Sequence, residues 1–288
     1  MIKSSELILN PDGSVYHLNL KPENIANDII FVGDQERVSK ITQHFDSIEF
    51  STQKREFKTE TGMYKGKRLT VQSTGIGPDN IDIVLNELDA LVNVDLNTRE
   101  IKPNHTALNI VRIGTSGSLQ ADIPVNSWVM SKYAIGLDNM LRSYLIEEHS
   151  VSELEDAFIA QTNWDLRKGR PTVVPCAEAL ENKIYSEKFQ KGFTGTAGGF
   201  YGPQGRVVRL NIQDPQLNSK MDAFNYNGTR MTNLEMETSA IYGLGKLLGH
   251  NCLSLNAIIA NRAVGEFSSK PEETVNELIK YTLDKLVE

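Results

Sequence analysis

The sequence lacks the features that mark several large classes of protein. Only Cys176 and Cys252 occur among the 288 residues, without a paired spacing, so we expect reduced core thiols and neither a disulfide nor a cysteine-ligated metal. No apolar run reaches the roughly 18 residues that a membrane span needs. The N-terminal apolar segment is too short for a signal peptide. These absences predict a cytoplasmic protein that does not bind a membrane.

Basic residues are also not concentrated in any part of the chain. The formal net charge is −7, and acidic and basic residues are mixed along the sequence. A nucleic-acid-binding surface needs a clustered basic face, so we expect no nucleic-acid partner, although a local basic pocket remains compatible with this charge. No linker or shift in composition marks a boundary, and we predict a single domain over residues 1–288.

The segment 108–119, LNIVRIGTSGSL, is the stretch around which the rest of the chain is organised. Its apolar start predicts a strand buried on both faces, and Arg112 lies inside that strand. A buried guanidinium keeps its proton and therefore needs a permanent anionic partner. We expect residues 114–117 to end the strand in a tight turn with exposed N–H groups and hydroxyls. This arrangement suits an oxyanion at the carboxyl edge of a sheet, but a structural carboxylate followed by an ordinary turn explains it equally well.

Two other predicted strands end in glycine just before a helix. The strand at residues 29–32 stops at Gly33, and Arg37 falls in the first turn of the next helix, where a cation opposes the helix dipole unless an anion is bound. The strand at residues 69–73 is followed by Gly75, Gly77 and then Pro78, which suits a first helical position. The first of these junctions therefore gives a second, weak indication of an anion site.

The later part of the chain contributes further polar candidates. Residues 193–209 form a glycine-rich loop in which Gln204 and Arg206 offer donors and an acceptor to a flat polar group, although an exposed turn is an equal explanation. Asn233 is a fair N-cap, so we expect a helix from this residue with Glu235 and Glu237 in its first turn, where the dipole favours them.

The order of the expected elements indicates the fold class. Strands are expected at residues 29–32, 69–73, 108–113, 128–130 and 253–260, and helices opening at residues 35, 78, 176, 233 and 271. The helix from residue 176 should run to residue 188, and the polar segment 93–106 should be a surface insertion. Alternating strands and helices predict an α/β protein, specifically a single-domain three-layer α/β/α sandwich with a central mixed β-sheet.

Taken together, the motifs resemble one family across most of the chain. In order they are Gly33-Asp34 with Arg37, Arg55-Glu56-Phe57, the segments 73–77 and 112–117, and Glu235-Met236-Glu237. This order resembles the nucleoside phosphorylase I superfamily, and Phe200, Gln204, Arg206 and the segment 259–262 are similar to its uridine phosphorylase branch. Purine-specific relatives usually carry an aspartate at the position of Asn261, where it protonates the purine N7 atom.

The resemblance implies roles for three groups of residues. The phosphate-binding residues would be Gly33, Arg37, Arg112, Thr115 and, from the neighbouring subunit, Arg55. The ribose-binding residues would be Met236, Glu237, the less certain Glu235 and, from the neighbouring subunit, His17. The base-binding residues would be Ser116, Gly117, Phe200, Gln204, Arg206, Ile259 and Arg262.

The implied reaction is phosphorolysis of uridine by inorganic phosphate to uracil and ribose 1-phosphate, which makes the protein a pentosyltransferase of nucleoside salvage. The resemblance implies no organic cofactor and a homo-oligomer of at least two subunits with shared sites. Some relatives hold a monovalent cation such as K⁺ between subunits near the counterpart of Glu56, but Asn80 at the other expected ligand position leaves this cation open here. Leu234 departs from the aromatic residue often found there, and the insertion at residues 93–106 could block packing beyond a dimer. The alternatives are a purine-nucleoside phosphorylase or nucleosidase on the same fold, and a non-catalytic nucleoside-binding homologue.

Overall fold

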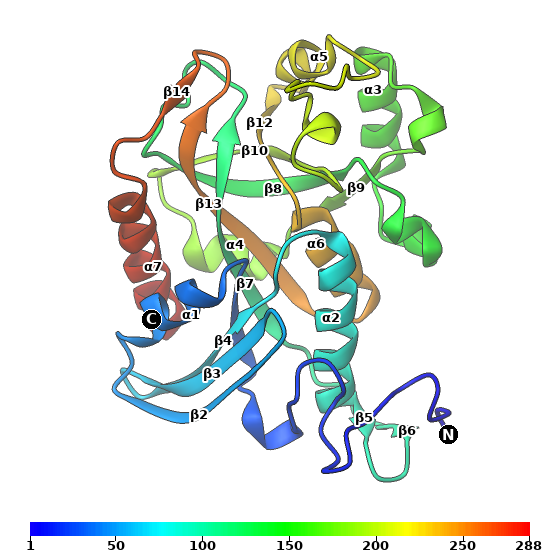
Figure 1. Ribbon diagram of the computed structural model, residues 1–288, viewed down its shortest axis with the longest axis vertical. Helices are drawn as coiled ribbons and strands as arrows, with labels where there is room; N and C mark the ends of the chain where they lie inside the picture. Colours follow the sequence, from blue (N-terminus) through cyan, green and yellow to red (C-terminus); the bar gives the residue numbers. More distant parts are fainter.

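The computed structural model describes residues 1–288, and its centre is a mixed β-sheet with helices on both faces (Figure 1). Its strands are β1 (Asp28–Val32), β2 (Ser47–Lys54), β3 (Phe57–Tyr64), β4 (Lys67–Ser73), β7 (Asn109–Ser118), β8 (Trp128–Gly136), β9 (Thr172–Pro175), β10 (Phe189–Thr196), β11 (Asn225–Tyr226), β12 (Thr229–Glu235), β13 (Asn251–Asn261) and β14 (Glu266–Phe267). A separate hairpin is made by β5 (Val94–Asp95) and β6 (Glu100–Ile101).

The helices are α1 (Gln35–Thr42), α2 (Pro78–Asn93), α3 (Ser152–Thr162), α4 (Glu178–Ile184), α5 (Leu217–Ala223), α6 (Thr238–Leu247) and α7 (Pro271–Val287). Short 3₁₀ turns lie at Pro22–Asn24, Met140–Ser143, Ile146–Glu148, Leu166–Lys168 and Gly202–Gln204. On one side α2 packs against α6, and α6 against β8, β10 and β13. On the other side α1 contacts β3 and β4, while α7 contacts β7 and β13 (Figure 1). No helix is long and apolar enough to cross a membrane.

The strands around β7 bring several chain segments to one edge. β1, β4, β7 and β13 are mutually parallel through the pairs β1–β4, β1–β7 and β13–β7. β7 also pairs antiparallel with β12 at Leu234 and Gly117. Because β12, β10, β8 and β13 pair in that order, these four strands and β7 form a closed ring. The carboxyl ends of β1, β4, β7 and β13 therefore open toward the same region, as the ligand-binding edge of an α/β sheet requires.

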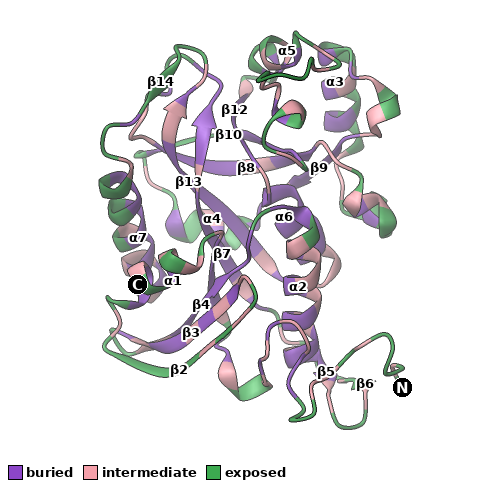
Figure 2. Cartoon of the chain, in the orientation of Figure 1, coloured by how far each residue is buried: buried purple, intermediate pink, exposed green.

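The core agrees with the helical and strand patterns of the sequence. The apolar stripe of α2 is completely buried, at Ile81, Val84, Leu85, Leu88 and Leu91. Figure 2 shows the central strands buried and the outer sides of α1, α2 and α7 partly exposed. The expected strands at residues 29–32, 69–73 and 253–260 and the helices opening at residues 35, 78 and 271 are confirmed.

Both cysteines are free and buried, as expected. Burial raises the pKa of Cys176 and of Cys252 to about 12, so neither is a thiolate near neutral pH.

The helix expected from Asn233 is wrong, because this residue lies in β12 and α6 begins only at Thr238. Asn233 is completely buried, and its amide bonds to Ser116, Thr194 and Thr232 on neighbouring strands or beside it. A strand with polar side chains can be buried when neighbouring strands provide hydrogen-bond partners for those side chains. The spacing of apolar residues in the sequence does not reveal such partners. Glu235 consequently ends a strand and does not lie in a first helical turn.

The turn expected at residues 114–117 is also wrong. β7 continues to Ser118, and its ladder with β13 runs as far as the pair Ser118 and Asn261. Gly114 has a different purpose, because a Cβ atom there would lie 1.9 Å from Nη1 of Arg112. The glycine therefore leaves room for the guanidinium to lie against the strand.

Two further boundaries differ from the expected ones. The helix expected at residues 176–188 is shorter, Glu178–Ile184, because Cys176 and Ala177 are bonded to neighbouring strands through their backbone N–H groups. The glycine-rich loop begins after Thr196, since the segment before it forms the end of β10. The surface insertion at residues 93–106 is confirmed as the excursion that carries the β5–β6 hairpin.

Candidate active site

A cavity of about 1150 Å³ opens at the carboxyl ends of the central strands. All the residues that the sequence analysis assigned to phosphate, ribose and base line it, with the exception of His17. They come from the residue after β1, α1, the β2–β3 turn, β7, the loop after β10, and the ends of β12 and β13 with the residues that follow them. The fold thus gathers residues that are more than 200 positions apart in the sequence.

Arg112 lies at one end of this cavity and is only 5% exposed. Its Nη2 atom bonds to Glu237 Oε2 and lies 3.3 Å from Glu235 Oε2, and its Nη1 donates to Asn256 Oδ1 at 3.0 Å. Burial by itself lowers the pKa of Arg112, but the carboxylates of Glu235 and Glu237 outweigh it and hold the pKa above its usual value. The guanidinium is therefore a permanent cation in a fixed orientation.

Arg37 lies close enough to Arg112 for the two cations to repel each other. Burial and the charge of Arg112 lower the pKa of Arg37. It makes no salt bridge, and its one hydrogen bond, 3.4 Å to the Ile113 carbonyl oxygen, is weak. Gly33 precedes the Asp34 N-cap of α1 at the same end of the cavity. A buried guanidinium and a half-buried one that lacks a carboxylate partner suit a bound anion.

Arg55 forms the tip of the β2–β3 hairpin and lines the cavity of its own chain. Its φ of 56° lies in the left-handed region, which an arginine rarely adopts without support. Gln35 supplies that support by donating its Nε2 to the Arg55 carbonyl oxygen at 2.5 Å. The hairpin tip is thus held at the rim of the cavity, and a contribution to a neighbouring subunit stays a prediction.

Glu237 and Glu235 line the cavity beside Arg112. Glu237 Oε1 accepts the Gly77 N–H at 2.8 Å, while its other oxygen holds Arg112. Glu235 accepts the N–H groups of Glu237 at 2.9 Å and Thr238 at 3.0 Å, and so satisfies the start of α6. Both carboxylates are nearly buried, and hydrogen-bond donors of the protein orient them.

Two more guanidiniums, those of Arg206 and Arg262, line another part of the cavity, which is called its base end below. Arg206 bonds to Gln204 Oε1 at 2.6 Å and lies 3.8 Å from the centre of the Phe200 ring. Arg262 donates from Nη2 to the Gln204 carbonyl oxygen at 2.6 Å, while its Nη1 is buried without a partner. Burial and the repulsion of Arg206 lower the pKa of Arg262 to about 10, and burial lowers the pKa of Arg206. Neither forms a salt bridge with a carboxylate, so this end attracts negative charge.

The structure gives Asn261 a role that the sequence did not reveal. Its Nδ2 donates to the carbonyl oxygens of Gln120 and Ile123, both at 2.9 Å, and its Oδ1 accepts the N–H groups of Ala263 and Val264. The amide is 1% exposed and is fully used by the backbone. Because the Nδ2 hydrogens of Asn261 go to backbone carbonyl oxygens, this side chain supplies no proton donor to the cavity.

Sequence reasoning missed two residues that orient site groups. Asn256, on β13, fixes the Arg112 guanidinium. The sequence did contain a signal for Asn256, because it is an uncharged polar residue in a strand that was predicted to be apolar. Glu87, on the otherwise apolar face of α2, binds His17, which lies outside the cavity of its own chain. The burial of Glu87 could not be predicted from the helical spacing of apolar residues.

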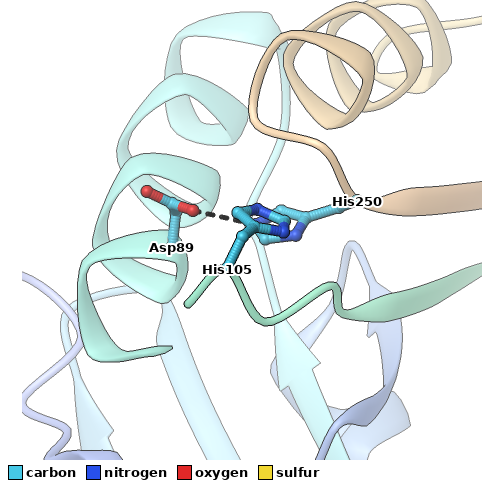
Figure 3. Close-up of side chains that lie close together, drawn as sticks. All are labelled: Asp89, His105 and His250. Carbon is cyan, nitrogen blue, oxygen red and sulfur yellow. Dashed lines mark ion pairs between the residues drawn. The ribbon is translucent and has the colours of Figure 1, made fainter. Parts of the chain in front are cut away.

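Another polar cluster, outside the cavity, joins Asp89, His105 and His250 (Figure 3). His250 Nδ1 accepts the Leu108 N–H at 3.2 Å, so a neutral ring carries its proton on Nε2, which lies 3.3 Å from Asp89 Oδ1. His105 Nε2 contacts the Leu248 carbonyl oxygen at 2.8 Å, and the two imidazole rings stack. A protonated Nε2 offers no lone pair to a metal, so this cluster fits a structural connection between the segment before β7 and the turn after α6.

Glu56 and Asn80, the residues at which the resemblance leaves a monovalent cation open, both line the cavity. A Cβ atom at Gly75 would lie 2.4 Å from Asn80 Nδ2 and 2.9 Å from Glu56 Cγ, so both side chains cover this glycine at the cavity. A K⁺ ion at this place stays a prediction.

A cavity at the carboxyl ends of the strands is where an α/β fold binds small ligands, and the guanidiniums that line this one suit an anion. The family model of the phosphorylase superfamily matches residues 28–288, and the chain belongs to this superfamily and, within it, to the nucleoside phosphorylases, which are pentosyltransferases. The predicted family is therefore confirmed.

Individual relatives are similar along nearly the whole chain. A uridine phosphorylase of Thermococcus kodakarensis is 28% identical over 277 residues, which cover 94% of this chain and 86% of the relative. A DeoD-type purine nucleoside phosphorylase of Bacillus cereus is also 28% identical, over 94% of this chain and 98% of its own. The crystal structure of a Trypanosoma brucei nucleoside phosphorylase, described as showing uridine phosphorylase activity, superposes with a TM-score of 0.88 at 31% identity, covering 98% and 99% of the two chains.

Proposed function

We propose that the protein catalyses phosphorolysis of uridine to uracil and ribose 1-phosphate. The observation that carries this proposal is the base end of the cavity, where Arg206 and Arg262 lack carboxylate partners and Asn261 is fully used by the backbone. A departing uracil carries negative charge on its ring and carbonyl oxygens, which guanidiniums stabilise. A departing purine instead needs a proton at N7, and an arginine does not give up its proton.

The reaction needs no nucleophile from the protein. An oxygen of phosphate forms a bond to the anomeric carbon, the bond from that carbon to uracil N1 breaks, and its electron pair leaves with the base, which then takes a proton from water. Arg37, Arg112 and Arg55 would hold the phosphate with Gly33 and Thr115, while Glu237 and Met236 would hold the ribose. Positioning both reactants in this way can contribute roughly 7–11 kcal/mol. Inorganic phosphate is the co-substrate, and no organic cofactor enters the reaction.

The position of His17 also supports a homo-oligomer of at least two subunits. His17 does not line the cavity of its own chain, and the family resemblance assigns it to the ribose of a neighbouring subunit. We therefore propose that each complete site contains groups from two copies of the chain.

Release of uracil from uridine, measured with and without inorganic phosphate, tests the proposed function. We expect release that depends on phosphate and yields ribose 1-phosphate in equal amount, with much slower release of hypoxanthine from inosine. Release without phosphate would indicate a nucleosidase, and preference for inosine would indicate a purine phosphorylase like the Bacillus relative. Binding of uridine without turnover would indicate a non-catalytic homologue.

Replacement of Arg206 by alanine tests the base end. The variant removes the guanidinium that contacts Gln204 and covers Phe200, so kcat/KM for uridine should fall by at least about tenfold, or ~1.4 kcal/mol. Arg209→Ala is the matched control, because Arg209 lies three residues further along the same loop, is exposed and does not line the cavity. Wild-type kinetics in Arg206→Ala would exclude the loop from the site.

A further inference from the structure

Glu87 and His17 form a carboxylate–imidazole pair outside the cavity. Glu87 lies on α2 and is 8% exposed, and its Oε1 lies 2.6 Å from His17 Nδ1. The same carboxylate accepts the backbone N–H of His17 at 3.0 Å and that of Leu18 at 2.8 Å. One buried side chain thus fixes both the backbone and the ring of His17.

These contacts determine the tautomer of the ring. The carboxylate oxygens of Glu87 accept two backbone N–H groups, so we take Glu87 as the acceptor in its contact with the ring as well. The Nδ1 atom must then carry the proton, which leaves Nε2 of a neutral ring as a hydrogen-bond acceptor. His17 Nε2 has no partner in its own chain, although 27% of the side chain is exposed. The imidazole is therefore prepared to accept a hydrogen bond from outside the chain.

The segment that carries His17 is also fixed on its other side. Val15 and Leu18 are completely buried, and the Tyr16 ring meets the His17 ring edge-on at 4.9 Å between centroids. Lys54 bonds to the Tyr16 carbonyl oxygen and lies 4.5 Å from the centre of its ring. A segment held by this many contacts, in a region that Figure 1 places beside α2, presents the ring in one orientation.

We propose that Glu87 is a positioning residue, which holds His17 as an acceptor for a hydroxyl group of the nucleoside bound in a second copy of the chain. The inference rests on the proposed function, and the family resemblance implies that this hydroxyl is the ribose 5′-hydroxyl. Its physical basis is that the oriented ring is partly exposed, has no partner for Nε2 in its own chain and does not line the cavity of its own subunit.

The variant Glu87→Gln tests this inference. A glutamine side chain keeps the shape and can still accept the backbone N–H groups, but it no longer enforces the Nδ1–H tautomer. We expect kcat/KM for uridine to fall about tenfold, the effect of one lost hydrogen bond, and kcat/KM for 5′-deoxyuridine to stay unchanged. In the background of His17→Ala, the Glu87→Gln change should have no further effect on the ratio between the two substrates.

Asp89→Asn is the matched control, because it removes the carboxylate of another carboxylate–histidine pair on the same helix. It should leave the ratio of the two substrates at the wild-type value. If Glu87→Gln leaves the ratio of kcat/KM for uridine and 5′-deoxyuridine at the wild-type value, the inference is overturned. The proposed function would still stand in that case, provided that the wild-type protein phosphorolyses uridine. If Glu87→Gln does not fold, nitrogen NMR of histidine-labelled wild-type protein decides, since an Nε2–H tautomer of His17 would contradict the proposal.

Discussion

Arg112→Ala is expected to lower kcat/KM for uridine phosphorolysis by at least about a hundredfold, because it removes a preorganised donor from the anion end of the cavity. It should also destabilise the fold by about 3–5 kcal/mol, since Glu235 and Glu237 would be left as buried carboxylates without their counter-ion. Denaturant unfolding and steady-state kinetics on the purified variant measure the two effects separately.

Arg142→Ala provides the matched control for Arg112→Ala. Arg142 also pairs with a nearly buried glutamate, Glu155, at 2.9 Å, but it does not line the cavity. This control should lose stability and keep its kcat/KM per folded molecule. A variant Arg112→Ala that retains wild-type kinetics would show that the Arg112 guanidinium does not act on the phosphate.

Mixing subunits should regenerate activity from two inactive variants. If Arg55 serves the neighbouring subunit, a dimer of one Arg55→Ala and one Arg112→Ala chain contains one site with both arginines intact. Random exchange in an equal mixture should then restore about a quarter of the wild-type sites, because half of the dimers are mixed and each holds one complete site. Activity of the mixture, followed against time after subunit exchange, is the measurement.

The same experiment distinguishes the two placements of Arg55. The structure places Arg55 at the rim of the cavity in its own chain. If it acts there, each mixed dimer still lacks one arginine in every site, and no activity returns. Absence of rescue, with exchange verified by mass spectrometry of the native dimer, would therefore contradict the shared site.

The spacing of apolar residues predicted those helices and strands in which buried positions recur at the regular helical or strand interval. The stripe of α2 and the buried strands β1, β4 and β13 follow from apolar spacing, since each packs its apolar side chains into the core. The pattern failed at β12, where Thr232 and Asn233 are buried and satisfied by partners on other strands. Such partners are set by the tertiary structure, so no local rule finds them.

The active site shows the same division between residues with a local sequence signal and residues whose role depends on distant partners. Arg112 was recognisable because a charge in a buried strand needs a partner, and Arg37 because a cation in a first helical turn opposes the helix dipole. The structure brings both to one cavity. The partners that orient these groups could not be predicted, because they come from distant segments. Asn256 lies 144 residues from Arg112, and Glu87 lies 70 residues from His17. Glycine at position 114 was noticed, but its reason, space for the Arg112 side chain, needs the three-dimensional structure.

A crystal structure of the protein grown in phosphate tests the central claim most directly. We predict one phosphate ion held by the guanidiniums of Arg37 and Arg112, beside Gly33 and Thr115 and next to the carboxylate of Glu237. Guanidiniums of Arg37 and Arg112 that point away from each other, with no anion shared between them, would contradict the account.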